Sequence, residues 1–445
     1  MKQKLIFAFS VMLISAAGFA QQDTQSFSLQ EAIDYALEHN RTVINAGKDI
    51  EAAEQQKWET TASGLPQINA NIEYNNWLKQ QITPVDLDGD GNNEEFVLGQ
   101  PQSLSATATL TQKIFDGSYL VGLQSAKVFL EISKNAKTKT DLSIRTAVIN
   151  AYGNVLLAEE SITILNKNID VLQKNLDETT KIFENGLEEE ESVEQLQITL
   201  SGVKSQLNNT KRLKKLAYQM LNITIGIDLN TATTLTDNLE TLTTQNINLE
   251  LLESDEAVEN TIDYLIAENN KTSKELLVKL EKSKALPTLN AFINGAYTGN
   301  SNTFTFTENS QKWYGSSAFG LSMSIPIFSS GMRSAATQRA KINLEKSQQD
   351  LNETEQQLKF QITSAKSDYQ FAIEDYNNKT QNLNLAERIE QKNQTKFFEG
   401  IASSFELRQA QTQLYTAQQE FLQAMLDVIN TKAALETALN TVEIN

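Results

Sequence analysis

The most suggestive chemical pattern in the chain is an acidic loop with Asp86, Asp88 and Asp90 at alternate positions before a glycine. In calcium-binding loops, carboxylates spaced in this way converge on the ion, and the glycine permits the sharp turn. Val97 stands where such a loop normally carries its bidentate Glu. Two interpretations therefore stay open, a calcium site in an outer loop or a solvated acidic turn. The candidate calcium ligands are Asp86, Asp88, Asp90 and Glu94.

Residues for other catalytic or metal chemistry are scarce. The chain has no cysteine, which excludes disulfides, thiol chemistry and cysteine-ligated metals. Its only histidine, His39, cannot form a Cys–His pair or a multi-histidine metal site within one chain, and its place in the first predicted helix is typical of a polar residue at a helix end. No glycine-rich phosphate loop occurs. We therefore predict that the protein is not an enzyme and needs no cofactor other than calcium in that loop.

The first twenty residues resemble a secretory signal. Lys2 and Lys4 precede an almost wholly apolar run from Leu5 to Ala17, and small residues follow at Gly18 and Ala20. This run is too short to cross a bilayer as a helix, so we expect a signal peptide at 1–20 that is cleaved. No later stretch is apolar enough for a membrane helix. A mature chain that spans a membrane must therefore do so with strands.

The charge balance is strongly acidic, with a formal net charge of −18. This charge argues against nucleic acid and anionic lipid headgroups as partners. It would suit a water-filled passage with a mild preference for cations, although solubility alone explains it equally well.

Internal repetition is the strongest organisational signal. Three short patterns from the first half recur in the same order in the second half. They are Leu65–Ala70 with Leu286–Ala291, Ile114–Phe115 with Ile327–Phe328, and Gly186 followed by Leu196–Gln197 with Gly400 followed by Ala410–Gln411. The sequence therefore predicts a first repeat at 21–227, a linker at 228–253 and a second repeat at 254–445. Each repeat would run helix, strand, loop, strand, long helix, tip and return helix.

The predicted long helices carry a heptad period rather than a simple helical one. Apolar residues at alternating three- and four-residue spacing keep one seam facing a partner helix. Alanine at alternate seam positions allows the two backbones to approach closely. In the first half the seam includes Ile144, Val148, Ala151, Val155, Ala158, Ile162, Leu165, Ile169 and Leu172. After the second tip it includes Leu407, Ala410, Leu414, Ala417, Phe421, Ala424, Val428 and Leu435. Helices alone leave open a plain coiled coil without a channel.

Four segments alternate apolar and polar residues with a period of two, near residues 66–75, 103–115, 287–298 and 313–328. Such alternation predicts strands with one apolar and one polar face. A lipid-facing band flanked by aromatic girdles has this pattern, and so does a soluble sheet packed on helices. The aromatic residues near the strand ends are Tyr74, Phe115, Tyr297, Trp313 and Phe328.

If these strands span a membrane, one chain cannot form the pore alone. Even the smallest transmembrane barrels need about eight strands, and an open sheet edge in lipid would leave backbone groups unpaired. Several chains must then share one barrel.

Several segments resemble the TolC-like outer membrane efflux protein family over essentially the whole mature chain. Ser28–Asn40 is similar to the first-helix signature of that family. The Leu-Pro pairs before the first and third strands, the Ile-Phe pairs after the second and fourth, and each tip glycine followed by a Leu/Ala–Gln seam are similar too.

The resemblance implies an α+β membrane protein built from two structural repeats. A long coiled-coil α-barrel would continue a transmembrane β-barrel shared by a homotrimer, with four strands from each chain. Proteins of this kind are outer-membrane exit ducts of Gram-negative bacteria with a large periplasmic extension. They pass drugs, other small solutes or secreted substrates and dock to a periplasmic adaptor of an inner-membrane pump.

The resemblance also assigns roles to particular residues. Family members meet the adaptor at tips that correspond to Gly186, Leu187, Gly400 and Ile401. Two acidic aperture residues of some members correspond to Glu406 and Gln409, so one carboxylate is kept and one is replaced. The alternative for Glu406 is a favourable charge in the first turn of a helix. The alternative for the whole chain is a secreted periplasmic coiled-coil scaffold or adaptor with a small soluble sheet.

Overall fold

The structure is a computed structural model that describes residues 25–85, 94–97, 99–254 and 257–441. The chain forms two compact units. Unit 1 consists of Met1–Asp49, Lys134–Ala267 and Asn352–Asn445, and unit 2 of Ile50–Ser133 and Glu268–Leu351. The predicted signal peptide at 1–20 lies outside the described residues.

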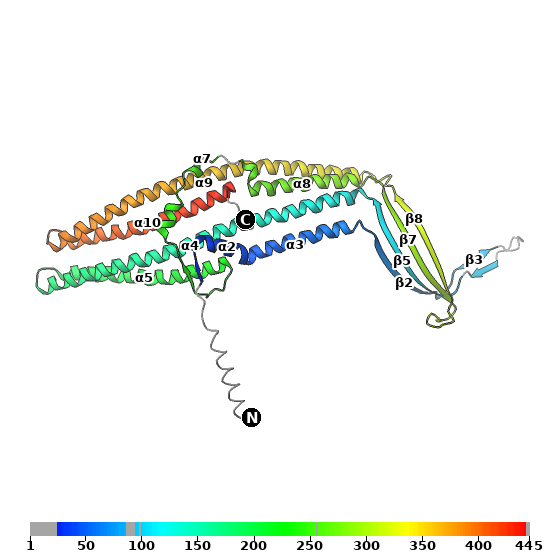
Figure 1. Ribbon diagram of the computed structural model, residues 1–445, viewed down its shortest axis with the longest axis horizontal. Coiled ribbons are helices and arrows are strands. Elements are labelled where there is room, and N and C mark those ends of the chain that lie inside the picture. The colour runs from blue at the N-terminus through cyan, green and yellow to red at the C-terminus, as the bar shows by residue number, and fades with distance from the viewer. Residues whose placement is uncertain (1–24, 86–93, 98, 255–256, 442–445) are drawn as a thin grey trace, which may run out of the picture. The chain divides into compact units, whose positions relative to one another are not determined.

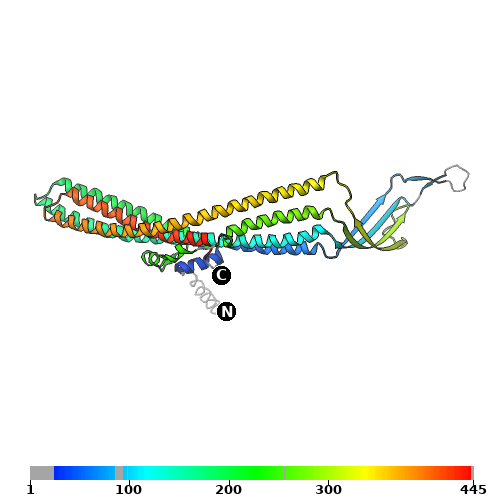
Figure 2. The ribbon, with the colours of Figure 1, turned by 90° about the horizontal axis from the view of Figure 1, so that it is seen from above.

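Two long helical hairpins, whose first helices begin in unit 2, make up most of unit 1. The helix α4 (Gly117–Glu184) turns back into α5 (Glu190–Ile225), and α9 (Met332–Phe398) turns back into α10 (Ser404–Leu439). Figures 1 and 2 show both turns at the same end of the unit. The other helices described in the chain are α2 (Leu29–His39), α3 (Arg41–Ala62), α6 (Leu239–Gln245), α7 (Glu250–Glu253), η2 (Val258–Asn260) and α8 (Ile262–Ser283). Most of α3 and of α8 belongs to unit 2. Within the described ranges, no helix is both long and apolar enough to cross a membrane.

The predicted heptad seams form the core of unit 1. Val148 and Val155 of α4 are fully buried, as are Val428 and Leu435 of α10. Alanines at alternate seam positions are buried as well, among them Ala417. A seam of this kind stabilises a helix pair mainly by removing apolar surface from water, at about 25 cal/mol per Å².

The segment at 228–253, predicted as a linker, is itself folded onto unit 1. Its strand β6 (Thr233–Leu235) pairs in parallel with β1 (Gln25–Phe27). The buried Tyr152 hydroxyl donates to the Phe27 carbonyl oxygen and to Asp237 Oδ2, each at 2.9 Å. These bonds satisfy a buried polar group and tie β1 and the residues after β6 to α4.

The first predicted helix is divided at Asn40. Ser28 and Glu31 form a reciprocal capping box that starts α2, and the extended backbone of Asn40 ends it. The Asn40 side chain accepts from Thr42 N and donates to the Thr224 carbonyl oxygen, both at 2.7 Å. This side chain therefore starts α3 and holds the break against α5.

The centre of unit 2 is one antiparallel four-stranded sheet in the order β2-β5-β7-β8 (Figure 1). The strands are β2 (Gln67–Asn76), β5 (Gln102–Phe115), β7 (Thr288–Ser301) and β8 (Trp313–Ser324). All three neighbouring pairs are antiparallel. Within the unit, β2 and β8 are the two outer strands of this sheet.

Two details differ from the sequence prediction. The fourth strand was expected to reach residue 328 but ends at Ser324, because Pro326 has no backbone N–H and cannot continue the ladder. The first outer loop carries a short hairpin of β3 (Ile82–Val85) and β4 (Glu94–Val97), which was not predicted. Proline and acidic residues are rare in strands, so Pro84 and the acidic composition of this loop gave no indication of a hairpin.

Candidate functional site

The four-stranded sheet has two chemically opposite faces. Because the strands pair in register, Ile72, Ala106 and Tyr297 form one row and point to one side. The next row, with Asn71 and Thr107, points to the other side. The period-two pattern of the sequence therefore becomes one apolar and one polar surface.

The apolar face is exposed in the single chain. Ile72 is 75% exposed and Phe319 is 71% exposed, whereas a soluble sheet packed on helices would bury them. This exposure contradicts the scaffold alternative, because water does not tolerate a contiguous apolar face of this kind without a cover. The exposed large apolar residues on this face are Ile68, Ile72, Tyr74, Ile293, Tyr297, Trp313, Phe319, Leu321 and Met323.

Phe292 is a large apolar residue that the sequence pattern places on the polar face. It pairs with Gly320 on β8, and its ring covers the glycine so closely that a Cβ there would lie 2.4 Å from the ring Cζ atom. Gly320 therefore makes room for Phe292, an arrangement in which an aromatic ring covers a strand glycine.

Both hairpins of unit 1 end in glycine turns. Gly186 and Gly400 have φ of 75° and 72°, in the left-handed region that favours glycine. Leu187 N donates to the Ile182 carbonyl oxygen at 3.1 Å and Gly186 N to that of Phe183 at 2.8 Å, the pattern of a Schellman helix end. The second turn has the same bonds at residues 396–401.

Each tip turn presents an apolar side chain to solvent. Leu187 is 79% exposed and Ile401 is 71% exposed. Behind them the hairpins pack together, with Phe397 and Leu407 buried next to the start of α5. The tips are therefore rigid turns that carry exposed apolar residues, which suits contact with a partner.

The aperture candidates lie in the first turns of α10. Glu406 and Gln409 are both exposed. Ser403 is the N-cap, and its backbone N–H donates to Glu406 Oε2 at 2.8 Å in a capping box. Hydrogen bonds from the Ser403 backbone and side chain lower the pKa of Glu406, so the carboxylate stays ionised at neutral pH. The helix-start role of Glu406 is thus present in the structure, and its aperture role stays a prediction.

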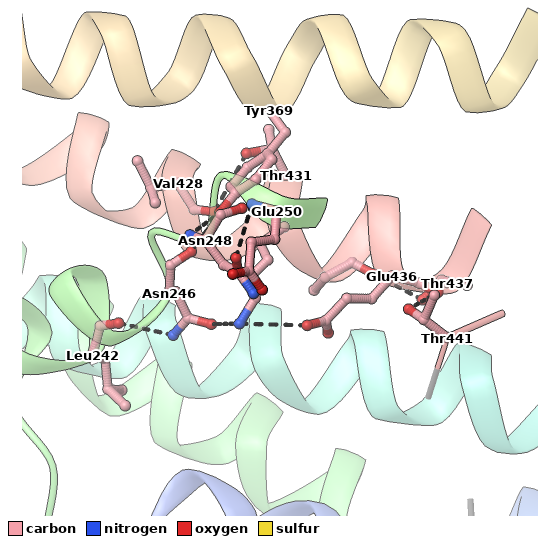
Figure 3. A network of polar contacts seen from close by, with 12 residues as sticks. Leu242, Asn246, Asn248, Glu250, Tyr369, Val428, Thr431, Glu436, Thr437 and Thr441 are labelled. Carbon is pink, nitrogen blue, oxygen red and sulfur yellow. Dashed lines mark hydrogen bonds and ion pairs between the residues drawn. The ribbon is translucent and has the colours of Figure 1, made fainter. Parts of the chain in front are cut away.

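A polar network fastens the 228–253 segment to the hairpins (Figure 3). The buried Tyr369 hydroxyl of α9 donates to the Asn246 carbonyl oxygen at 2.7 Å and accepts from Asn248 N at 2.8 Å. Lys432 of α10 reaches Asn246 Oδ1 at 3.0 Å and Glu436 Oε1 at 3.4 Å. The sequence did not predict this network, because most of its members lie far apart in the chain. Only Lys432 and Glu436, four residues apart on one helix, have a spacing that indicates an ion pair.

The network continues onto α4. Arg145 Nη2 lies 2.7 Å from Glu436 Oε2, and the two side chains are only 16% and 17% exposed. Thr146 and Thr437 share a hydrogen bond of 3.0 Å beside this pair. Three helices and the 228–253 segment are therefore held together by the Tyr369 hydroxyl and by charged side chains with little access to water.

Nearer the tips, buried amides link the hairpins. Asn168 Nδ2 donates to Gln418 Oε1 at 2.8 Å, and Gln394 Nε2 donates to Asn175 Oδ1 at 2.8 Å. Asn168 and Asn175 are one heptad apart on α4. Buried amides at such positions fix the register of packed helices, because a shifted register would leave them unpaired.

One carboxyl in this region is poised to respond to pH. Burial raises the pKa of Glu390, and the nearby Gln411 amide offsets part of the effect. The folded chain therefore binds this proton more tightly than the unfolded chain, and stability should rise as pH falls from above the raised pKa towards the ordinary value of 4.5. The free energy of unfolding should change by no more than about 1.4 kcal/mol per pH unit through this group.

Unfolding midpoints measured against pH should show this rise in the wild type and not in Glu390→Gln. Parallel curves for the two proteins would contradict the assignment.

Metal and histidine predictions have different outcomes. Asp86, Asp88 and Asp90 lie outside the described residues, as does the side chain of Glu94, so calcium binding stays a prediction. Within the described ranges, no cluster of three or more His, Asp or Glu side chains is placed to hold a metal ion. His39 stacks on Tyr35 with ring centroids 3.9 Å apart at the end of α2.

Comparison with known proteins gives the chain a family. The model of the outer membrane efflux protein family matches residues 32–226 and 254–441. The outer membrane protein TolC of Vibrio cholerae is 23% identical over 447 residues, which cover 97% of this chain and 94% of that protein.

Solved structures share the fold. CusC, described in a study of its folding and transmembrane channel formation, superposes with a TM-score of 0.75 at 17% identity and covers 93% of this chain and 92% of its own. The outer membrane protein VceC of Vibrio cholerae superposes with a TM-score of 0.71 at 17% identity, covering 92% of this chain and 95% of its own. The family resemblance and the outer-membrane location predicted from sequence are confirmed. The chain belongs to the outer membrane efflux protein family and is a TolC-like protein of the Gram-negative outer membrane.

Proposed function

We propose that copies of this chain join through the outer strands β2 and β8 into one closed transmembrane barrel, which conducts solutes from the periplasm to the outside. The observation that carries the proposal is a four-stranded sheet with one exposed apolar face, one polar face and two open edges. Lipid would cover the apolar face and water the polar face. Pairing between chains would satisfy the edge N–H and C=O groups that lipid leaves unsatisfied.

The number of copies rests on the family resemblance, which implies a homotrimer. The same resemblance supports two structural repeats and a helical barrel that extends the pore into the periplasm. The lining that we propose is rich in Asn, Thr and Ser, which have little chemical preference, so drugs, other small solutes and secreted substrates are all acceptable cargo. The chain itself would do no chemistry, and an inner-membrane pump would supply the energy.

We further propose that the hairpin tips dock to a periplasmic adaptor of that pump. The exposed Leu187 and Ile401 support this role, because rigid turns that hold apolar side chains in water lose little entropy when a partner covers them. The tip glycines Gly186 and Gly400 keep the turns in the left-handed conformation that presents these side chains.

Planar bilayer recording tests the conduit directly. Purified oligomer should insert and give discrete, uniform conductance steps with a mild preference for cations, because the chain is acidic. Correctly folded oligomer that inserts repeatedly without any conductance would refute the pore.

The aperture role of Glu406 has its own test. Glu406→Gln should change ion selectivity or leakiness, because the loss of a ring of like charges near the aperture would weaken the preference for cations and remove the repulsion that favours opening. Gln also fits the capping box, so the helix start should survive this change. Ser403→Ala is the matched control, since it weakens the cap and keeps the carboxylate. If conductance, selectivity and dye efflux are all unchanged in Glu406→Gln, Glu406 serves only to start α10.

A further inference from the structure

A polar hollow of about 910 Å³ lies at the loop end of the sheet in unit 2. The register places Ser103 and Tyr314 of its lining on the polar face of the sheet. Its walls come from the two outer loops, one after β2 and the other between β7 and β8. None of the sequence patterns predicted this hollow.

Hydrogen bonds hold the walls in place. Trp77 N donates to the Pro101 carbonyl oxygen at 2.8 Å, and Gln80 Nε2 donates to that of Gly99 at 3.2 Å. In the other loop, the Gln311 amide accepts from Thr305 Oγ1 at 2.6 Å. These bonds fix the rim before any ligand arrives, which lowers the entropy that binding would cost.

The same loop is also anchored on the opposite face of the sheet. Phe306 is buried there, with its ring centroid 5.9 Å from that of Tyr74 and 6.3 Å from that of Trp313. Because Tyr74 and Trp313 belong to the two outer strands, this contact clips the loop across the sheet. The rim of the hollow therefore rests on a rigid base.

Two aromatic rings stand out in this hollow. Trp77 is 56% exposed and Tyr314 is 62% exposed, although both lie beside a face whose other side chains are mostly amides and hydroxyls. Apart from the Tyr314 phenol, Lys312 is the only ionisable side chain among the described lining residues. The hollow thus offers aromatic platforms, amide groups such as those of Gln81 and Gln100, and almost no charge.

This combination selects for one class of ligand. A hexose ring has an apolar C–H face that stacks on Trp or Tyr, and hydroxyls around its edge that pair with amides. A phosphate-bearing ligand would call for several cations, and an apolar ligand would leave the amides unpaired.

We infer that this hollow is a binding site for neutral saccharides, with Trp77 and Tyr314 as stacking platforms and the glutamine side chains as hydroxyl partners. The site lies within one chain, so it does not depend on the proposed conduction. The saccharide can be a free oligosaccharide or the sugar portion of a surface glycolipid, because both present the same chemistry.

Calorimetry on the full chain tests the inference, with maltoheptaose, laminariheptaose and a phosphate-free O-polysaccharide as probes. The protein should be purified in a detergent without a sugar headgroup, because a maltoside would itself compete. At least one probe should bind, and Trp77→Ala or Tyr314→Ala should weaken it about ten-fold, whereas Tyr314→Phe keeps the ring and should retain the affinity. Binding of the heptaoses indicates a free oligosaccharide as ligand, and binding of the O-polysaccharide alone indicates the glycolipid.

Trp58→Phe is the matched control, because Trp58 is 60% exposed on α3 and lies outside the hollow. It should leave the affinity unchanged. The inference is overturned if no neutral probe binds to correctly folded protein, or if Trp77→Ala and Tyr314→Ala both bind as well as the wild type.

Discussion

Ile293→Arg should prevent stable assembly of the protein in the outer membrane, whereas Asn294→Arg should be tolerated. The two residues are neighbours on β7, one of the two inner strands, and point to opposite faces of the sheet. Ile293 is 52% exposed on the apolar face, where we place lipid. An Arg on the lipid face of a barrel costs about 2–4 kcal/mol at the bilayer midplane, and each copy in the ring would bear that cost.

Membrane fractionation and sizing in detergent measure this difference. Ile293→Arg should yield little oligomer and more degraded chain, while Asn294→Arg should fractionate as the wild type does. The matched pair controls for charge, size and strand position. Equal assembly of the two variants would mean that lipid does not touch the apolar face.

Glu436→Leu should destabilise unit 1 by about 3 kcal/mol, because it leaves the half-buried cations Arg145 and Lys432 without their carboxylate. The expected effect is large. When one partner of a poorly solvated ion pair is removed, the other charge stays buried without a counter-charge. The double variant Arg145→Leu, Glu436→Leu should recover part of the loss, since both members of the closest pair are then gone.

Native-state hydrogen exchange in α10 and the 228–253 segment reports this loss as opening about a hundred-fold more frequent. Glu420→Leu is the matched control, because Glu420 pairs with Lys379 at 3.0 Å but its side chain is 46% exposed. Such a pair should contribute at most about 1 kcal/mol. If Glu436→Leu and Glu420→Leu had equal effects, the network of Figure 3 would not hold the segment in place.

Periodic features of the fold were predictable from the sequence. Ile68, Ile72 and Tyr74 alternate with polar residues because a strand sends successive side chains to opposite faces, and the sheet keeps that alternation. Val148 and Val155 are one heptad apart, as are Val428 and Leu435, because a helical seam requires this spacing, and all four are buried. The turns at Gly186 and Gly400 were predictable for the same local reason, since few other residues adopt a positive φ.

Features that depend on distant partners were not predictable. Tyr369 looks like an ordinary helical residue in the sequence, and its role appears only when Asn246 and Asn248 fold beside it. The saccharide hollow likewise joins residues from two loops that are more than 200 positions apart in the chain. A local hydrophobic period in the sequence does not show that two such loops meet. The aperture residues Glu406 and Gln409, the tip contacts and the calcium loop stay predictions, because each needs a second copy, a partner or an ion.

Disulfide crosslinking between the outer strands β2 and β8 of different copies tests most directly whether several chains share one barrel. The sequence has no native cysteine, so only the introduced cysteines can form a disulfide. A cysteine replacing Asn71 on β2 would be combined in turn with one replacing Tyr314, Ser316 or Ala318 on β8, all on the polar face. Within one chain these positions lie on opposite edges of the sheet, so a bond must join two copies. We predict that at least one combination gives a covalently closed ring of chains in membranes, and single cysteines do not. Membrane-embedded protein that forms no crosslink in any register would contradict the shared barrel.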